Sequence, residues 1–165
     1  NRDFGRLVRP ALDALADVDV LVVATAGGRD PREIGTLPAN ARAVRYVSYD
    51  ALLPRTAAVV TNGGFGGVQA ALAAGVPLVV AGGTEDKPEV AARVGWSGAG
   101  VDLRTGSPDA AAVRAAVSAV LSTPDYARHA SRIAADAAAH DALTEIADAL
   151  ASSRAGWRAP RAWEG

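Results

Sequence analysis

The sequence contains no cysteine among its 165 residues, which excludes both a disulfide framework and a thiolate metal site. Neither sign of charge dominates, because 17 basic residues stand against 18 acidic ones. Without a basic field, nothing in the sequence supports a nucleic-acid partner. No apolar run approaches the ~20 residues of a membrane span, and no stretch has the pattern of a signal peptide. We expect a cytoplasmic location.

Strand-length apolar runs alternate with helical patterns along the chain. The expected strands are residues 19–25, 43–47, 57–61, 77–81 and 98–103. The expected helices are residues 2–16, a single turn at 49–53, then 65–74, 88–96, 108–121 and 124–150, the last broken near His140 and Asp141. This alternation predicts a Rossmann-like, doubly wound α/β fold with a mostly parallel sheet, whose ligands bind where the strands end.

The length suits one domain with its own core. We assign residues 1–151 to that domain and residues 152–165 to a C-terminal tail. The tail holds Trp157 and Trp163, for which we expect no chemistry. Because the chain begins at Asn1 rather than at a methionine, we expect a fragment or a processed chain.

A glycine-rich turn follows the expected strand 57–61 and opens the next helix. Its residues are Asn62, Gly63, Gly64, Phe65, Gly66 and Gly67. The first amides of a helix have no partner within it and lie at the positive end of its dipole, and glycines let a phosphate approach the backbone. A tight turn without a ligand is the alternative, but it would need fewer glycines. The turn is neither an ATPase P-loop nor a dinucleotide fingerprint. We therefore interpret it as a diphosphate cradle.

Two further loops are expected at the same edge of the sheet. Glu85 and Asp86 follow the expected strand 77–81 and could accept hydrogen bonds from sugar hydroxyls. A solvated loop, or a helix cap at Asp86, is the alternative. Tyr46 and Tyr49 flank the end of the second expected strand, where a ring could stack on a nucleobase or simply pack under the short helix.

The region from Val44 to Val101 resembles a known family. It reads VRYVSYDALLPRTAAVVTNGGFGGVQAALAAGVPLVVAGGTEDKPEVAARVGWSGAGV and looks like the donor-binding signature of inverting, two-domain nucleotide-sugar glycosyltransferases of the GT-B type. The members most like it are bacterial enzymes that decorate macrolides, enediynes and other natural products. The likeness runs from about Val18 to Leu150. It implies that the chain is the donor-binding, C-terminal half of a GT-B fold.

The resemblance implies roles for individual residues. Tyr46 and Val47 fall where the family holds the nucleobase. Asn62 stands where the family most often has a His that touches the diphosphate, and Gly63 to Gly67 fall on the diphosphate cradle. Many members bind the ribose hydroxyls with a Glu one position after Gln69. This chain lacks that Glu, so either Gln69 substitutes for it or the contact is absent.

At the sugar end the match is partial. Asp86 falls on the acidic residue with which the family binds sugar hydroxyls, and Glu85 lies beside it. Lys87 replaces the Gln that is usual in plant members, which leaves the choice of sugar open.

The family likeness predicts the donor-binding half of an enzyme that moves a sugar from a UDP- or dTDP-sugar to a hydroxyl of a small natural product. No metal or cofactor is expected. The family's catalytic base, usually a His, belongs to the N-terminal acceptor-binding half, so we expect no catalytic residue here and no activity from this chain alone. His129 and His140 lie in the C-terminal helices and are not expected to be catalysts. A nucleotide-sugar epimerase of related fold and a non-catalytic nucleotide-binding or helper module are the alternatives.

In the resembling fold a further strand precedes the first helix of this chain and lies between the strands expected at residues 19–25 and 57–61. That strand is missing from the sequence. We therefore expect these two runs not to pair directly, and either another polypeptide segment or a gap of about two strand spacings, ~10 Å, to separate them.

Overall fold

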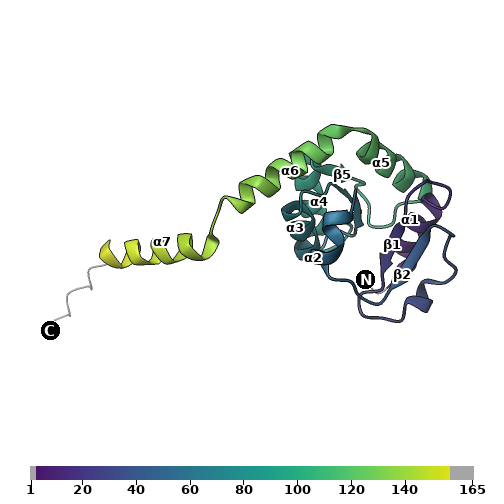
Figure 1. Cartoon of the computed structure of the whole chain (residues 1–165), viewed down its shortest axis with the longest axis horizontal. Coiled ribbons are helices and arrows are strands. Elements are labelled where there is room, and N and C mark those ends of the chain that lie inside the picture. Colours follow the sequence, from purple (N-terminus) through teal and green to yellow (C-terminus); the bar gives the residue numbers. More distant parts are fainter. Residues whose placement is uncertain (1–2, 157–165) are drawn as a thin grey trace.

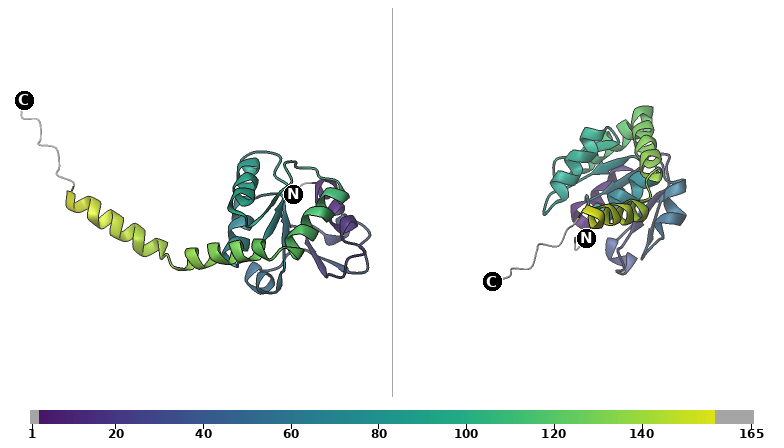
Figure 2. Two further views of the ribbon diagram at one scale, coloured as in Figure 1. Left: turned by 90° about the horizontal axis from the view of Figure 1, so that it is seen from above. Right: turned by 90° about the vertical axis from the view of Figure 1, so that its left-hand side faces the viewer.

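The computed structural model describes residues 3–156 and forms two parallel sheets with helices on both sides (Figures 1 and 2). One sheet joins β1 (Val22–Thr25) to β2 (Ala41–Val44). The other has the order β3-β4-β5, with β3 at Val59–Thr61, β4 at Leu78–Val80 and β5 at Gly100–Asp102. The mixed α/β class with parallel strands, predicted from the alternation of elements, is confirmed.

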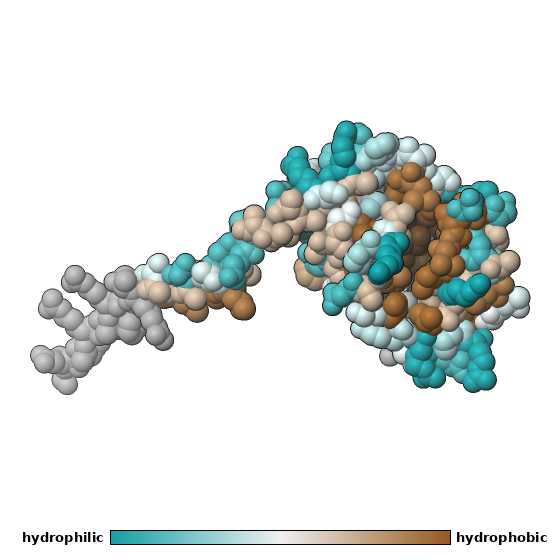
Figure 3. Space-filling view, viewed as in Figure 1, coloured by the Kyte–Doolittle hydropathy of each residue, from teal (hydrophilic) through white to brown (hydrophobic). Residues whose placement is uncertain are grey.

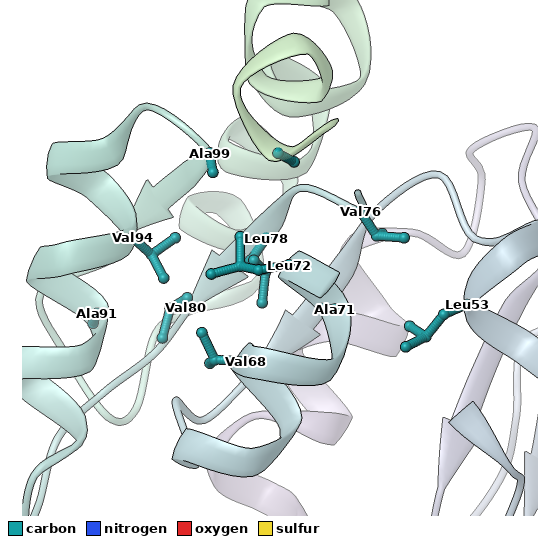
Figure 4. Packing of buried hydrophobic residues seen from close by; sticks show 11 residues of the cluster. Leu53, Val68, Ala71, Leu72, Val76, Leu78, Val80, Ala91, Val94 and Ala99 are labelled. Carbon is teal, nitrogen blue, oxygen red and sulfur yellow. The ribbon is translucent and has the colours of Figure 1, made fainter. Parts of the chain in front are cut away.

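Strand β4 is the centre of the larger sheet, and all three of its side chains are buried. Leu78 and Val80 face the layer made by α3 (Phe65–Ala73) and α4 (Lys87–Ser97), as Figure 4 shows. Val79 faces the opposite layer, with side chains of α1 (Val8–Ala14) and α5 (Ala110–Ser122). Because neighbouring residues of a strand point to opposite faces, an unbroken apolar run here fits a sheet covered on both sides.

The first helix differs from the expectation of one helix over residues 2–16. A short 3₁₀ helix, Phe4–Arg6, is separated from α1 by Leu7, whose φ of −142° breaks the helix. Pro10 then falls in the first turn of α1, where its missing N–H is not needed. Pro10, which would be unfavourable inside a helix over residues 2–16, is thus compatible with a helix that starts at Val8.

The second strand was predicted at residues 43–47 and lies at Ala41–Val44 instead. Its register explains the shift, because Ala41 pairs with Val22 and Val44 with Thr25, where β1 ends. The segment between the two strands also holds a 3₁₀ helix, Pro31–Ile34, that was expected to be loop. The capping box between Asp30 and Glu33 stabilises its start.

Strands β1 and β3 do not pair, as expected from the missing strand. Val22 of β1 and Val60 of β3 both pack against the cluster formed with α1 and α5, so the two sheets share one layer of helices. Figure 3 shows apolar residues lining a hollow between the sheets. Whether another polypeptide segment supplies a strand there stays a prediction.

Two further helices follow α5 at the C-terminal end of the described chain. Helix α6 (Pro124–Ala138) packs on α3, and α7 (Ala142–Gly156) extends away from the body (Figures 1 and 2). The break predicted near His140 and Asp141 is confirmed. Helix α7 runs through Ala151, the expected domain end, and Trp157 and Trp163 of the expected tail lie outside the described residues. None of the described helices is long and apolar enough to cross a membrane.

One polar side chain organises the turn between α1 and β1. The amide nitrogen Nδ2 of Asn40 lies 2.8 Å from the carbonyl oxygen of Leu15, 3.0 Å from that of Val18 and 3.1 Å from that of Val20. Its own Oδ1 is buried without a partner among the described residues. Asn40 thus acts as a donor that holds three carbonyl groups of the preceding segment.

We expect Asn40→Ala to lower the free energy of unfolding by about 1–3 kcal/mol, because the carbonyls lose their donor. Asn40→Asp should cost more than Asn40→Ala, since a carboxylate would face three carbonyl oxygens and offer no N–H. Urea denaturation of the three proteins measures both effects. Equal stability of Asn40→Asp and the wild type would show that the donor role is unimportant.

Candidate functional site

The carboxyl ends of β3, β4 and β5 meet at one edge of the larger sheet, because all three strands are parallel. Ladder hydrogen bonds continue into the loops there. The amide of Ala81 donates to the carbonyl of Thr61 at 2.8 Å, and the amide of Leu103 donates to that of Val80 at 2.9 Å. The loops that follow the three strands therefore start from fixed, adjacent positions.

The glycine-rich turn after β3 presents the start of α3 at this edge. Gly64 is the N-cap residue with φ −60° and ψ 127°, and no side chain caps the helix. The first intrahelical bond runs from the Val68 amide to the Gly64 carbonyl, 3.1 Å away. The amides of residues 65–67 precede that bond and have no partner within the helix. With the helix dipole, they form a site suited to an anion.

Gly63 joins this turn to the neighbouring loop. Its φ of +84° favours glycine, and a Cβ there would lie 3.0 Å from Val80 Cγ1 and 3.3 Å from the carbonyl oxygen of Lys87. The residue is buried between β4 and the start of α4. The structure thus brings the predicted cradle into contact with residues 82–87, the loop after β4 that carries Glu85 and Asp86 and that we call the acidic loop.

The side chains of the cradle leave its backbone accessible. Phe65 is 61% exposed, and Asn62 is half-buried with its Oδ1 on the Gly64 side of the turn. Gln69, the candidate for the ribose, is exposed on α3 just beyond the first turn.

The loop after β4 carries the predicted sugar-binding residues. Glu85 has a left-handed backbone, φ 61°, and its carboxylate forms an ion pair with the ammonium group of Lys87. Asp86 occupies the N-cap position of α4 and is exposed, but its side chain makes no capping hydrogen bond. The capping alternative for the Asp86 carboxylate is therefore wrong, and this carboxylate is available to a ligand.

The predicted base-binding residues follow β2. Tyr46 is 77% exposed and Val47 is half-buried. Tyr49 begins α2 (Tyr49–Leu52), and its hydroxyl lies against the cradle, 3.3 Å from where a Cβ of Gly67 would be. Sequence reasoning considered Tyr49 for base stacking or packing and missed this contact, since residues 49 and 67 meet only in the folded chain.

The two histidines and the ion pair between Asp17 and Arg114 lie away from this edge. His129 Nδ1 is 3.2 Å from the Gly98 carbonyl oxygen, and His140 Nδ1 is 2.7 Å from a carboxylate oxygen of Glu145. A hydrogen bond from Arg114 lowers the pKa of the Asp17 carboxyl, which belongs to the contact between the end of α1 and α5. Within residues 3–156, no three acidic or histidine side chains gather as metal ligands would.

Comparison with known proteins identifies the family to which the chain belongs. Residues 9–152 match the family described as "Erythromycin biosynthesis protein CIII-like, C-terminal domain". The chain is 52% identical over 148 residues to 4'-demethylrebeccamycin synthase of Lentzea aerocolonigenes, covering 90% of this chain and 35% of that protein. It is 44% identical over 133 residues to UDP-glucosyltransferase 1 of Beauveria bassiana (strain ARSEF 2860), covering 79% of this chain and 29% of that one.

A solved structure agrees with these relatives. The glycosyltransferase VinC in complex with dTDP superposes with a TM-score of 0.76 at 32% identity, covering 88% of this chain and 37% of VinC. The fold is thus that of a C-terminal domain found in glycosyltransferases. The chain belongs to the erythromycin biosynthesis protein CIII-like C-terminal domain family, and it spans about a third of the length of these relatives. The epimerase alternative is not favoured.

The cradle makes a prediction about Gly64. A Cβ at this position would meet only Asn62 Oδ1, at 3.8 Å, and the backbone has negative φ, so we expect Gly64→Val to be compatible with the fold. The added side chain blocks the approach of a diphosphate to the helix amides. We expect UDP and dTDP to bind about tenfold or more weakly, measured by calorimetry. Unchanged affinity would place the diphosphate elsewhere.

The free carboxylate of Asp86 makes a second prediction. Asp86→Ala should weaken binding of a nucleotide sugar by roughly 10- to 100-fold, because hydrogen bonds to a charged group contribute about 1.5–3 kcal/mol. Binding of the bare nucleoside diphosphate should change little. Glu89→Ala, which removes an exposed carboxylate of α4 that is paired with Arg93, is the matched control. An equal loss for both ligands would mean that Asp86 acts through the shape of the loop.

Proposed function

We propose that this chain is the donor-binding domain of a glycosyltransferase that moves a sugar, with inversion, from a UDP- or dTDP-sugar to a hydroxyl of a small natural product. The observation that carries the proposal is the contact between the glycine-rich start of α3 and the loop of Asp86 through Gly63. A diphosphate at the first element places the attached sugar near the second.

The diphosphate would be held by the amides of residues 65–67, with Asn62 as a further donor. Negative charge grows on the diphosphate as the sugar leaves, and helix amides stabilise that charge without reorganising. Lys87 offers little additional positive charge because Glu85 is paired with it. The domain would act without a metal ion, since the helix terminus itself supplies the positive potential.

The rest of the donor would extend to both sides of the diphosphate. Tyr46 would stack on the base and the backbone of Val47 would meet its edge, while Gln69 would contact the ribose. At the other end Asp86 would accept hydrogen bonds from the sugar hydroxyls. The ion pair of Glu85 and Lys87 would lie beside it in the same loop. Nothing in these contacts selects uracil over thymine. The Beauveria relative is named for UDP and VinC was solved with dTDP, which supports considering both nucleotides.

The acceptor and the catalytic base would belong to an N-terminal domain outside this chain. Inverting transfer needs a base that deprotonates the acceptor hydroxyl and a wall that positions the acceptor. Neither His129 nor His140 lies at the edge of the sheet. The relatives are about three times as long as the matched region, which supports the presence of such a domain in the parent protein. A cytoplasmic location of the parent stays a prediction.

The test compares this 165-residue chain with the same chain joined to an N-terminal acceptor domain. The joined protein should release UDP or dTDP and glycosylate a hydroxylated acceptor, measured by mass spectrometry of the product. The isolated chain should bind the nucleotide but transfer nothing. Multiple-turnover transfer by the isolated chain, abolished by a substitution within it, would overturn the proposed division of roles.

A further inference from the structure

The loop after β5 reaches the acidic loop through two glycines. A Cβ built on Gly83 would lie 2.6 Å from the Cα of Gly106, and a Cβ built on Gly106 would lie 2.8 Å from the Cα of Gly83. Real Cβ atoms do not approach backbone atoms this closely, so a methyl group at either position would force the two loops apart. Both residues have ordinary negative or extended φ, so this close approach, and not backbone conformation, requires glycine here.

The segment that holds Gly106, residues 104–107, is shaped by local hydrogen bonds. We call it the brace loop. The amide of Arg104 donates to Asp102 Oδ1 at 2.7 Å, and the amide of Ser107 donates to Thr105 Oγ1 at 3.2 Å. Arg104 has a left-handed backbone with φ 55°. These local bonds give the brace loop a defined shape at the end of β5.

A distant side chain holds the far end of the brace loop. Arg6 Nε donates to Ser107 Oγ at 3.0 Å, and Arg6 Nη2 lies 3.2 Å from where a Cβ of Gly106 would be. Arg6 belongs to the 3₁₀ helix at the start of the chain, whose Phe4 is buried in the cluster beneath β1 and β2. The brace loop is therefore fixed to the smaller sheet as well as to β5.

The acidic loop is compact, because its two ends, Gly82 and Lys87, are in close contact. A Cβ on Gly82 would lie 2.3 Å from the carbonyl oxygen of Lys87, and the Lys87 amide donates to the Thr84 carbonyl at 3.2 Å. The contact between Gly82 and Lys87 thus closes the loop, and Asp86 is one of the residues between them. Gly83 and Asp86 therefore belong to the same closed loop.

We propose that Gly106 is a positioning residue for the sugar end of the donor, and that Arg6 and Ser107 assist it. The brace loop contacts Gly83 and sets the place of the Asp86 carboxylate, while the cradle after β3 meets this loop at its other end, where Gly63 lies against Lys87. The inference rests on the proposed function, because it requires a nucleotide sugar whose sugar lies at Asp86. It adds a role for residues that do not touch the ligand.

The first test is Gly106→Ala in the full chain, with UDP and dTDP and the corresponding glucose nucleotides as probes in calorimetry. Small misplacements of a contact group have large effects, so the nucleotide sugar should bind about tenfold more weakly, while the nucleoside diphosphate should bind within about twofold of the wild type. Ser122→Ala is the control, because its exposed hydroxyl at the end of α5 contacts, among the described residues, only the Ala119 carbonyl, at 3.5 Å. Equal losses for both ligands, or no loss, would overturn the positioning role.

The second test removes the bond between Arg6 and Ser107, and it carries the proposal if Gly106→Ala fails to fold. Arg6→Ala and Ser107→Ala should each weaken binding of the nucleotide sugar by about threefold, the effect of one ordinary hydrogen bond. The double variant should lose no more than either single one, since both remove the same bond. Additive losses, or losses shared with the bare diphosphate, would refute the proposal. Absence of nucleotide binding by the wild type would instead refute the proposed function itself.

Discussion

Burial of β4 on both faces is the constraint on which the rest of the structure depends. Leu78 and Val80 are covered by α3 and α4, and Val79 by α1 and α5, so β4 cannot shift without exposing one layer. Its two neighbours are parallel to it and end at the same edge. Packing far from any ligand therefore sets where the three functional loops begin, and the loops need only short backbone segments to meet.

Close contacts at glycine residues then fix the positions of these loops relative to one another. Gly63 lies against Val80 and Lys87, and Gly82 also lies against Lys87. Gly83 lies against Gly106, and each of these contacts is so close that a Cβ on the glycine would crowd its neighbour. A site assembled in this way depends little on the rotamers of long side chains. Preorganised groups stabilise charge at little cost of reorganisation.

Local patterns in the sequence were enough to predict the buried β4, the glycine-rich start of α3 and the break before α7, because each depends on neighbours in the chain. The split at Leu7 and the register of β2 were missed, since pairing with β1 and packing under the sheets decide them. The contact of Tyr49 with Gly67 and that of Gly83 with Gly106 join residues far apart in sequence. No periodicity or turn signal encodes such contacts, so only the folded chain reveals them.

The exposure of the site bears on how the proposed chemistry would work. Tyr46 and Phe65 are 77% and 61% exposed, so the described edge is open to water. Charges interact weakly in water, and the helix dipole would give a leaving diphosphate little help in an open half-cleft. A second domain closing over the donor would exclude water and strengthen the same amides without moving them. Donor activation would then be coupled to acceptor binding, because a single closure would complete both.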